Sequence, residues 1–356
     1  MALTVAFIGT GKRRERGSLE GYAMAYTHAP GYQALDDVEL VAACDIIEDN
    51  VNAFAEQFGI ERTFSEYHEM LAEVRPEAVS ICTWPHLHEQ MVIDCAQAGV
   101  KLIYCEKPIA DTIGGARRML EVCDRTGAAL NFNHQRRYGK PFSMAKQMLD
   151  DGAIGDLWRM EWGGANIYDY GSHNFDMAQY FNDETPPSWV MAQIDYHTES
   201  FWFGAHNENE ALALIGYDNG VFGLVATGAV QGAVGAHNRL VGSEGVIEIG
   251  SQAEGAGPLR YRAFGEGGWE SVDTGGEGLH GQVFIERAIA DAVNSYRGGT
   301  RAMMDAHYAI HGTEAIFACW ESSRLRKRVE VPIEAEDNPL QEMVQAGDLN
   351  PQPAEE

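Results

Sequence analysis

The chain has 356 residues, 45% of them hydrophobic, and carries a formal net charge of −27. This length predicts two domains with separate cores, and the apolar content excludes a disordered or fibrous protein. The negative charge excludes nucleic acid as a partner, because phosphate binding requires a basic face.

The N-terminal residues and the cysteine spacing predict the compartment in which the protein is found. Residues 1–8 carry no basic leader and run into a glycine turn, so they are expected to form a buried strand rather than a signal peptide. No apolar run is long enough to span a bilayer, which predicts no membrane partner. None of the six cysteines forms a C-x-x-C pair, and this pattern favours a cytoplasmic location.

Short apolar runs alternate with longer segments of helical spacing in the first third of the chain. This order predicts an α/β fold class, with a Rossmann domain over residues 1–133 that holds a doubly wound parallel sheet. The expected strands are 3–8, 39–44, 78–82, 102–104 and 129–132.

The pattern changes after residue 133. A C-terminal α+β domain with a large open, mostly antiparallel sheet is predicted over residues 134–333, and Asp218-Asn219-Gly220 is a hairpin signal within it. The glycine-rich stretch 251–277 is expected to form surface loops, and the acidic tail 334–356 either hangs loose or wraps a neighbouring subunit. The expected strands are 158–162, 190–196, 209–217, 221–227, 237–241 and 246–249, and the expected helices are 144–149, 174–181, 283–296 and 307–322.

The turn Gly9-Thr10-Gly11 directly follows the first predicted strand. Glycines there permit a tight turn and let backbone N–H groups approach a pyrophosphate. The third glycine of a dinucleotide fingerprint is replaced by an insertion, 12–20, with Gly21 as a candidate for packing the next helix. Arg13 or Arg14 reaches a cofactor phosphate in one interpretation, and both lie in a solvated loop in the other.

Asp45 ends the second predicted strand, where a carboxylate accepts hydrogen bonds from the adenosine ribose and repels a 2′-phosphate. This favours NAD over NADP. Thr83, Pro85 and His88 follow the third strand at the edge where such sheets bind ligands, so we expect them to border the cofactor. His86 and His88 lack further ligands at metal spacing, and no metal is predicted.

Glu106-Lys107-Pro108 follows the fourth strand at the same edge. Because proline disfavours the helical region for the preceding residue, Lys107 should be held extended. A lysine fixed there donates a hydrogen bond to a substrate oxygen and stabilises developing negative charge, and Glu106 is expected to border the cofactor beside it. The alternative is a lysine in a surface turn, which its position at the ligand-binding edge disfavours.

His173 lies at the start of the predicted helix 174–181. Asp169 precedes it by four residues, so helical geometry brings both to one side, and Gly171 permits a sharp turn into the helix. A neutral histidine with a pKa near the working pH suits proton removal from an alcohol. Asp176 is a second acid that either orients the imidazole or caps the helix.

With these residues in view, nearly the whole chain resembles the glucose-fructose oxidoreductase/inositol dehydrogenase/MocA (Gfo/Idh/MocA) family. The resemblance rests on a set of motifs in a fixed order: Gly9-Thr10-Gly11, Asp45, Thr83 with Pro85 and His88, Cys105-Glu106-Lys107-Pro108, Arg136-Arg137-Tyr138, the Asp169, Gly171, His173, Asp176 pattern, and Gly242-Ser243-Glu244-Gly245. The insertion 12–20 departs from the family pattern, which affects the pyrophosphate contacts and the choice of cofactor.

The resemblance implies an N-terminal Rossmann domain, a C-terminal open sheet that forms a homodimer or homotetramer, and a sugar or polyol substrate used with NAD or NADP. It further implies that Lys107 is the site lysine, that His173 is the acid/base, and that Asp169 contacts the reacting hydroxyl.

These residues predict an NAD(P)-dependent oxidoreductase that moves a hydride between a hydroxyl-bearing carbon and nicotinamide. Arg137, Trp162, Asn166 and Tyr168 are candidates for contacts to substrate or cofactor, with packing at the domain interface as an equal alternative, and His237 is a candidate for lining the pocket. Two other functions stay open. One is an NAD-dependent glycoside-cleaving enzyme that oxidises C3 transiently, and the other is a non-catalytic dinucleotide-binding sensor.

Overall fold

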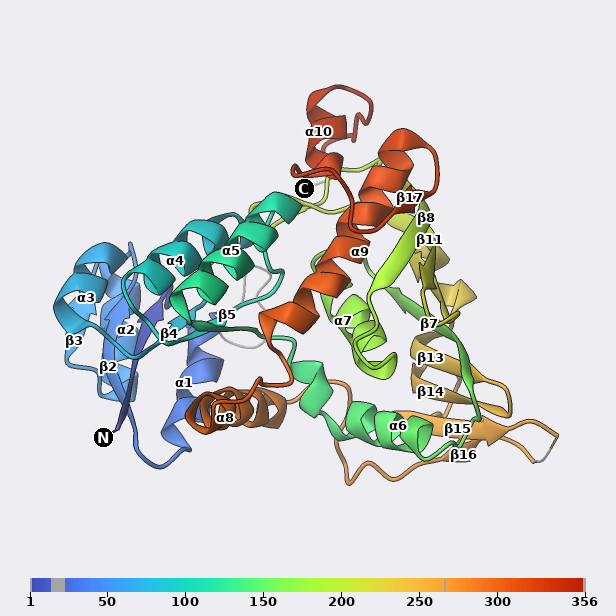
Figure 1. Cartoon of the computed structure of the whole chain (residues 1–356), viewed down its shortest axis with the longest axis horizontal. Coiled ribbons are helices and arrows are strands. Elements are labelled where there is room, and N and C mark those ends of the chain that lie inside the picture. The colour runs from blue at the N-terminus through green and yellow to red at the C-terminus, as the bar shows by residue number, and fades with distance from the viewer. Residues whose placement is uncertain (1, 14–22, 266, 355–356) are drawn as a thin grey trace. The chain divides into compact units, whose positions relative to one another are not determined.

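A computed structural model describes residues 2–13, 23–265 and 267–354 (Figure 1). The described residues form two compact units. The first unit draws on 1–111, 115–135 and 282–307, and the second on 112–114, 136–281 and 308–356. No helix of the described ranges is both long and apolar enough to cross a lipid bilayer.

A six-stranded parallel sheet forms the centre of the first unit, in the order β3-β2-β1-β4-β5-β6. The strand order reverses between β1 and β4, which creates the switch point at which doubly wound sheets bind ligands. This confirms the predicted fold class and adds β3, a short strand that the apolar pattern did not predict. The strands are β1 (Leu3–Ile8), β2 (Val38–Cys44), β3 (Arg62–Phe64), β4 (Ala78–Ile81), β5 (Leu102–Cys105) and β6 (Ala129–Phe132).

Helices connect and cover these strands. They are α1 (Ala25–Gln33), α2 (Glu48–Phe58), α3 (Tyr67–Val74), α4 (Pro85–Gln97), α5 (Ile113–Thr126) and α8 (Gln282–Gly298). The helix α8 comes from late in the chain and packs beside α1 in this unit (Figure 1). The structure therefore differs from the predicted division, which assigned α8 to the C-terminal domain.

The close approach of α8 to α1 has a local cause. Gly31 of α1 has no side chain, and a Cβ atom there would lie 2.9 Å from Cδ1 of Ile289 on α8. A hydrogen bond from the Tyr296 hydroxyl of α8 to the Glu77 carboxylate, 2.6 Å long, fixes the far end of the helix. Both contacts join residues far apart in sequence, so helical periodicity alone does not reveal them.

A nine-stranded sheet forms the centre of the second unit, in the order β16-β15-β14-β13-β7-β12-β11-β8-β17. Every neighbouring pair is antiparallel except β7 with β12, as predicted for a mostly antiparallel sheet. The strands are β7 (Leu157–Gly164), β8 (Pro187–Asp195), β11 (Glu210–Tyr217), β12 (Phe222–Thr227), β13 (Ala236–Gly242), β14 (Gly245–Ser251), β15 (Leu259–Ala263), β16 (Glu270–Ser271) and β17 (Val329–Glu330), and a separate hairpin pairs β9 (Phe201–Trp202) with β10 (Ala205–His206).

The helices of the second unit are α6 (Lys140–Asp150), α7 (Ser172–Phe181), α9 (Ala306–Leu325) and α10 (Pro339–Gln345), with 3₁₀ turns η1 (Gln135–Tyr138) and η2 (Gly228–Ala233). The predicted hairpin turn is present between β11 and β12, where Gly220 adopts a φ of +84°. The stretch 251–277 departs from the predicted loops, because β15 and β16 extend the sheet there.

The described part of the acidic tail, residues 334–354, is an ordered part of the second unit. Asn338 caps α10 by accepting a hydrogen bond from the Gln341 backbone N–H at 3.0 Å. Leu340 and Met343 are buried, and the Gln352 N–H donates to the His197 carbonyl at 2.7 Å. Buried apolar side chains within an acidic segment thus anchor a tail for which the sequence left a loose state open.

The two faces of the nine-stranded sheet differ at its β8–β11–β12 end. Ile215, Val190 and Val225 face one side and are fully buried. The alternate residues face the other side, and four of them form an outer apolar patch that is 43–56% exposed: Met191, Leu212, Leu214 and Phe222. Strand alternation and register place these four side chains next to one another across β8, β11 and β12.

Candidate active site

The glycine turn lies at the carboxyl end of β1, at the switch point of the first sheet. Gly9 and Gly11 have φ values of +82° and +64°, which favour glycine. A Cβ atom on Gly9 would lie 2.6 Å from Cγ2 of Thr83 and 3.1 Å from the Cys82 carbonyl oxygen. Glycine is therefore required at this position, and the backbone presents no side chain of its own to a ligand there.

Asp45 at the end of β2 locks this turn. Its Oδ2 accepts hydrogen bonds from the Gly11 N–H at 2.8 Å and from the Thr10 hydroxyl at 3.1 Å. Its Oδ1 accepts from the Ile47 N–H at 2.9 Å. Because a carboxylate offers about four acceptor positions, one remains for a ribose hydroxyl. The turn and the predicted ribose-binding carboxylate thus form one rigid group.

Of the two arginines predicted to reach a cofactor phosphate, the structure describes only Arg13. Arg13 is exposed and donates a hydrogen bond to Oε1 of Gln57 at 2.9 Å, so its guanidinium is engaged by α2. Arg14 and Gly21 lie outside the described residues.

The loop after β4 holds the next group of predicted contacts. Pro85 begins α4, and the Thr83 hydroxyl lies 3.4 Å from the Met91 sulfur. His88 is fully buried, and its ring nitrogens face backbone carbonyls of Thr83 at 3.1 Å and Pro108 at 3.0 Å. This histidine joins the loops after β4 and β5, and its effect on a cofactor would be indirect. Among the described residues no cluster of His, Cys, Asp or Glu side chains has a metal-binding arrangement.

A buried polar network surrounds the Glu106 carboxylate. Its Oε1 accepts hydrogen bonds from Nε2 of His28 at 2.8 Å and from Nδ2 of Asn133 at 2.7 Å. Its Oε2 accepts from the backbone N–H of Lys107 at 3.2 Å. Glu106 therefore ties α1 and the end of β6 to the residue that begins the lysine turn, and Lys107 itself is half-buried. Glu106, which the sequence predicted to border the cofactor, instead has its carboxylate occupied by protein donors.

His28 and Glu106 form a buried ion pair. Although burial opposes a charge on His28, its contacts with Cys82 and Glu106 outweigh this effect and raise its pKa to about 10. Burial also opposes the Glu106 charge, but the His28 and Asn133 hydrogen bonds lower its pKa. The sequence did not single out His28, because its partners Ser80, Glu106 and Asn133 lie 52, 78 and 105 residues away.

In the second unit, a turn leads into α7 and carries the predicted acid–base pair. The Ser172 N–H donates to the Tyr168 carbonyl at 3.0 Å, so the helical path already begins before α7 and places Asp169 one turn ahead of His173. A Cβ atom on Gly171 would lie 2.5 Å from the Asn166 and Ile167 carbonyl oxygens. The sharp turn predicted at Gly171 is therefore a steric requirement. His173 is 6% exposed, and Asp169 is half-buried.

Two neighbouring residues, Asn207 and Glu208, hold the Asp169 turn in place. Oδ1 of Asn207 accepts from the Asp169 N–H at 3.1 Å, and Oε1 of Glu208 accepts from the Ile167 N–H at 2.6 Å. Burial raises the pKa of Glu208 to about 7, against the opposing hydrogen bond from Ile167. The sequence pattern of 199–209 was too irregular to indicate this role, although two polar residues directly before the predicted strand 209–217 were a signal.

The four predicted contact residues have structural roles within the second unit. Trp162 is 1% exposed and packs edge-on against Phe175 at 5.2 Å between ring centroids. Tyr168 is buried against Trp320, with 5.3 Å between ring centroids. Oδ1 of Asn166 accepts from the Tyr170 N–H at 2.9 Å. These placements agree with packing rather than with direct contact to a substrate.

Arg137, the fourth of them, is also a structural residue. It is fully buried, and its Nε and Nη2 donate to the two carboxylate oxygens of Asp176 at 2.8 and 2.7 Å. Its Nη1 contacts Glu184. Asp176 is therefore engaged by Arg137, an ion pair within the second unit that the sequence did not predict.

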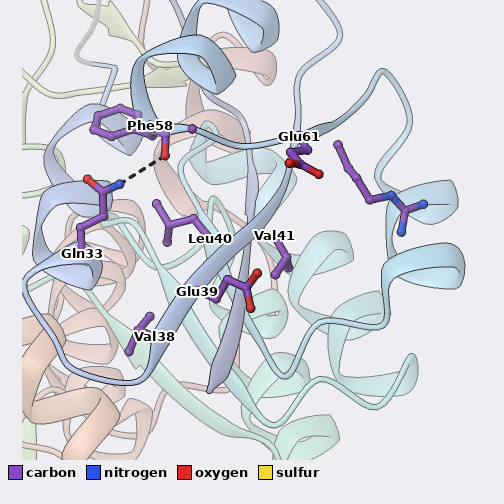
Figure 2. Close-up of a pocket in the computed structure, with 9 residues that line it drawn as sticks. Gln33, Val38, Glu39, Leu40, Val41, Phe58 and Glu61 are labelled. Carbon is purple, nitrogen blue, oxygen red and sulfur yellow. Dashed lines mark hydrogen bonds between the residues drawn. The ribbon is translucent and has the colours of Figure 1, made fainter. Parts of the chain in front are cut away.

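A cavity of about 740 Å³ lies at the opposite end of the first sheet from the glycine turn. It is open because β3 pairs with β2 only at residues 42–44, which leaves 38–41 without a neighbour on that side. Figure 2 shows Gln33 at its rim, donating to the Phe58 carbonyl at 3.2 Å. Its lining includes Glu39, Glu61 and Arg62 and none of the predicted nucleotide-binding residues. This cavity is therefore separate from the edge of the sheet where the nucleotide is predicted to bind.

Comparison with known proteins decides the family. Residues 3–134 match the model described as "Oxidoreductase family, NAD-binding Rossmann fold", and residues 135–248 match that of the GFO/IDH/MocA C-terminal domain. The chain belongs to the Gfo/Idh/MocA family. Its first unit is accordingly an NAD-binding Rossmann domain.

Named members of the Gfo/Idh/MocA family are distant from this chain. Myo-inositol 2-dehydrogenase of Thermotoga maritima is 26% identical over 56% of this chain and 63% of that protein. D-glucoside 3-dehydrogenase of Escherichia coli is 27% identical over 50% of this chain and 53% of that protein. The chain thus spans about half to three-fifths of the length of these relatives.

A solved relative supports the fold. The WlbA dehydrogenase of Bordetella pertussis, in complex with NADH and UDP-GlcNAcA, superimposes with a TM-score of 0.73 at 20% identity, over 94% of this chain and 100% of that one.

Replacing His28 by Gln should change how stability depends on pH. The imidazole pKa is about 6.5 in the unfolded chain and about 10 in the folded one. Between these values the folded protein holds a proton that the unfolded chain has lost, so the free energy of unfolding falls as pH rises. We expect urea denaturation at pH 6, 8 and 9.5 to show this fall in the wild type and a smaller one in His28→Gln. Equal pH dependence in both proteins would contradict the buried ion pair.

Proposed function

We propose that the protein is an NAD-dependent oxidoreductase that moves a hydride between a hydroxyl-bearing carbon of a sugar or polyol and nicotinamide. The observation that supports this most strongly is the glycine turn locked to Asp45 at the switch point of the first sheet. The names of the relatives, inositol and glucoside dehydrogenases, support the substrate class.

The residues of the first unit fit a dinucleotide. The turn at Gly9 and Gly11 leaves room for a pyrophosphate, and Asp45 retains an acceptor for a ribose hydroxyl. When bound, the nicotinamide accepts the hydride from the substrate carbon. The tied loops after β4 and β5, joined by His88, fix the edge where this chemistry would take place.

Lys107 and His173 divide the work on the substrate hydroxyl. The His173 imidazole removes the hydroxyl proton, and Asp169, one turn earlier, orients the ring or the hydroxyl. The Lys107 ammonium donates a hydrogen bond to the same oxygen and stabilises its developing negative charge. In the reverse direction His173 returns the proton, so the same groups serve both reactions.

Replacing His173 by Ala should lower kcat by about 10²–10⁴-fold, the usual contribution of general acid–base catalysis. The dissociation constant for NAD should change little, because the residues proposed to hold the dinucleotide, Gly9, Gly11 and Asp45, are unchanged in this variant. Steady-state assays at saturating NAD measure the first quantity, and fluorescence titration with NADH measures the second.

A matched control for this variant is His197→Ala, because His197 is an exposed histidine of the same unit. It should retain wild-type kcat. A fully active His173→Ala enzyme would remove His173 from the mechanism.

The cofactor preference should be for NAD. The carboxylate of Asp45 is fixed by three hydrogen bonds, so it cannot turn away from a 2′-phosphate. We expect kcat/KM to favour NAD over NADP by about tenfold or more, the equivalent of 1.4 kcal/mol or more of repulsion. Asp45→Asn should reduce this ratio, and a clear NADP preference of the wild type would overturn the assignment.

A second candidate reaction is redox-neutral cleavage of a glycoside. The relative named D-glucoside 3-dehydrogenase favours it, because a ketone at C3 acidifies the neighbouring C–H and permits elimination of the glycosidic oxygen. The same lysine and histidine would serve. Product formed from a glycoside without net NADH selects this reaction, whereas NAD binding without turnover of any sugar would favour a sensor.

The outer apolar patch supports assembly with a second copy of the chain. It continues into a ladder of ion pairs on the same face, in which Arg239 bridges Glu161 at 2.8 Å and Glu248 at 2.7 Å. An exposed apolar face bordered by charges of both signs is self-complementary, which suits a two-fold symmetric dimer, or a tetramer built from such dimers.

Replacing Leu214 by Glu should shift the protein to a smaller species in sedimentation velocity, because the carboxylate would be buried at the interface. Leu325→Glu is the matched control, since Leu325 is 46% exposed and belongs to α9 rather than to the strands that carry the patch. A monomeric wild type, or equal assembly of both variants, would contradict this interface.

A further inference from the structure

Two consecutive arginines of η1 are buried in the second unit, and they differ in their counter-charges. Arg137 is matched by the carboxylates of Asp176 and Glu184. Arg136 is 2% exposed, yet it forms no ion pair with an Asp or Glu of the described residues. The chain has 53 acidic residues against 26 lysines and arginines, so acidic side chains are abundant. The lack of one beside Arg136 therefore calls for a physical explanation.

Neutral groups surround the Arg136 guanidinium. Its Nη1 donates to Oδ1 of Asn174 at 3.0 Å and contacts Nε2 of His237, and its Cζ lies 4.8 Å from the Tyr170 ring centre. Its Nε has no hydrogen-bond partner within the part of the chain that the structure describes. These contacts orient the guanidinium without neutralising it, and they leave one of its donors unused.

The two histidines of this cluster add no compensating charge. Burial and the charge of Arg136 lower the pKa of His237 well below its usual range, and the same two causes lower the pKa of His280. Nδ1 of His237 contacts the Asn238 amide oxygen, which leaves Nε2 as the acceptor toward Arg136. The cluster thus combines one buried positive charge with two neutral imidazoles. A buried charge of this kind is costly unless an opposite charge joins it.

We propose that Arg136 binds the carboxylate of an acidic substrate, so that the preferred substrate is a sugar or polyol acid. This inference rests on the proposed function and specifies its substrate class. A guanidinium donates two parallel N–H bonds to a carboxylate, and Nε with one terminal nitrogen forms such a pair. The one unmatched positive charge of the cluster equals the one negative charge of a carboxylate, whereas a phosphate ester carries up to two.

The cluster also lies next to the proposed acid–base pair. Tyr170, over which the guanidinium stacks, directly follows Asp169. Asn174, which Arg136 contacts, directly follows His173 on α7. A carboxylate at Arg136 would therefore anchor one end of a substrate beside the segment that carries Asp169 and His173.

The test compares acids with their neutral counterparts. The protein is assayed at saturating NAD with three pairs of substrates: glucuronate and glucose, galacturonate and galactose, and gluconate and glucitol. Glucose 6-phosphate is added as an anion that carries a phosphate in place of a carboxylate. We expect kcat/KM of the wild type to favour an acid over its neutral counterpart by about tenfold or more. In Arg136→Met this ratio should fall by about 10- to 100-fold, as for a lost hydrogen bond to a charged group. A wild-type ratio near one, an unchanged ratio in the variant, or a preference for glucose 6-phosphate would overturn the proposal.

Stability without ligand separates this role from a structural one. Arg136→Met removes an unmatched charge, so its melting temperature should equal or exceed that of the wild type. Arg137→Met leaves Asp176 and Glu184 without their partner and should melt well below the wild type. A large loss of melting temperature in Arg136→Met would assign Arg136 to structure and contradict the proposal.

Calorimetry distinguishes failure of the inference from failure of the proposed function. The preferred acid is titrated into the NAD-loaded wild type and into Arg136→Met. Binding that depends on Arg136 without NADH formation would uphold the anion site and contradict the redox function. Oxidation of neutral sugars without preference for acids would uphold the redox function and contradict the anion site.

Discussion

The hydrogen bonds of the buried Glu106 carboxylate fix the carboxyl edge of the first sheet, where we propose that the cofactor binds. The carboxylate accepts hydrogen bonds from His28 of α1, from Asn133 after β6 and from the Lys107 backbone. A buried carboxylate is tolerated only when its acceptors are satisfied, and here a charged partner is among the donors. Loss of His28 would leave the charge of Glu106 unmatched, and loss of either neutral donor would leave one of its acceptor positions unsatisfied. The backbone of Lys107, the proposed site lysine, is thus held by a buried carboxylate that pairs with His28.

In the second unit, the buried charged groups around α7 also have hydrogen-bond partners, and Arg136 is the exception. Arg137 is neutralised by Asp176 and Glu184, and Glu208 is held by the Ile167 backbone and by Trp320 at 3.1 Å. Each of these groups fixes the segment that carries Asp169 and His173. Of Arg137, Glu208 and Arg136, only Arg136 has a side-chain nitrogen without a hydrogen-bond partner among the described residues. This buried charge is therefore the position at which we propose that a ligand carboxylate binds.

The sequence predicted the parts of this structure that depend on local pattern. Alternating apolar runs located β1, β2, β4, β5 and β6, and the Asp218-Asn219-Gly220 turn located the β11–β12 hairpin. The requirement for glycine at Gly9 and Gly171 was also visible, because each sits at a junction where a strand or turn changes direction.

The contacts that the sequence did not reveal join distant residues. The packing of α8 on α1 depends on the absence of a side chain at Gly31, some 258 positions before Ile289. The pairing of Asp176 with Arg137 depends on where η1 lies in the fold. Trp162 and Tyr168 have the residue types of a sugar site, but burial makes them core residues. Composition and spacing do not distinguish these cases, because side-chain burial is set by tertiary packing.

Transfer of deuterium from substrate to cofactor tests the central claim most directly. A sugar or sugar acid labelled with deuterium at its ring carbons is incubated with NAD and a stoichiometric amount of the protein. The reaction is quenched by denaturation during turnover, before a reduced cofactor can return the deuteride, and all nicotinamide is recovered and analysed by mass spectrometry. Both the net dehydrogenase and the redox-neutral reaction predict deuterium at C4 of the nicotinamide in the wild type and its loss in His173→Ala. Bound NAD that stays unlabelled with every substrate would contradict hydride transfer by this protein.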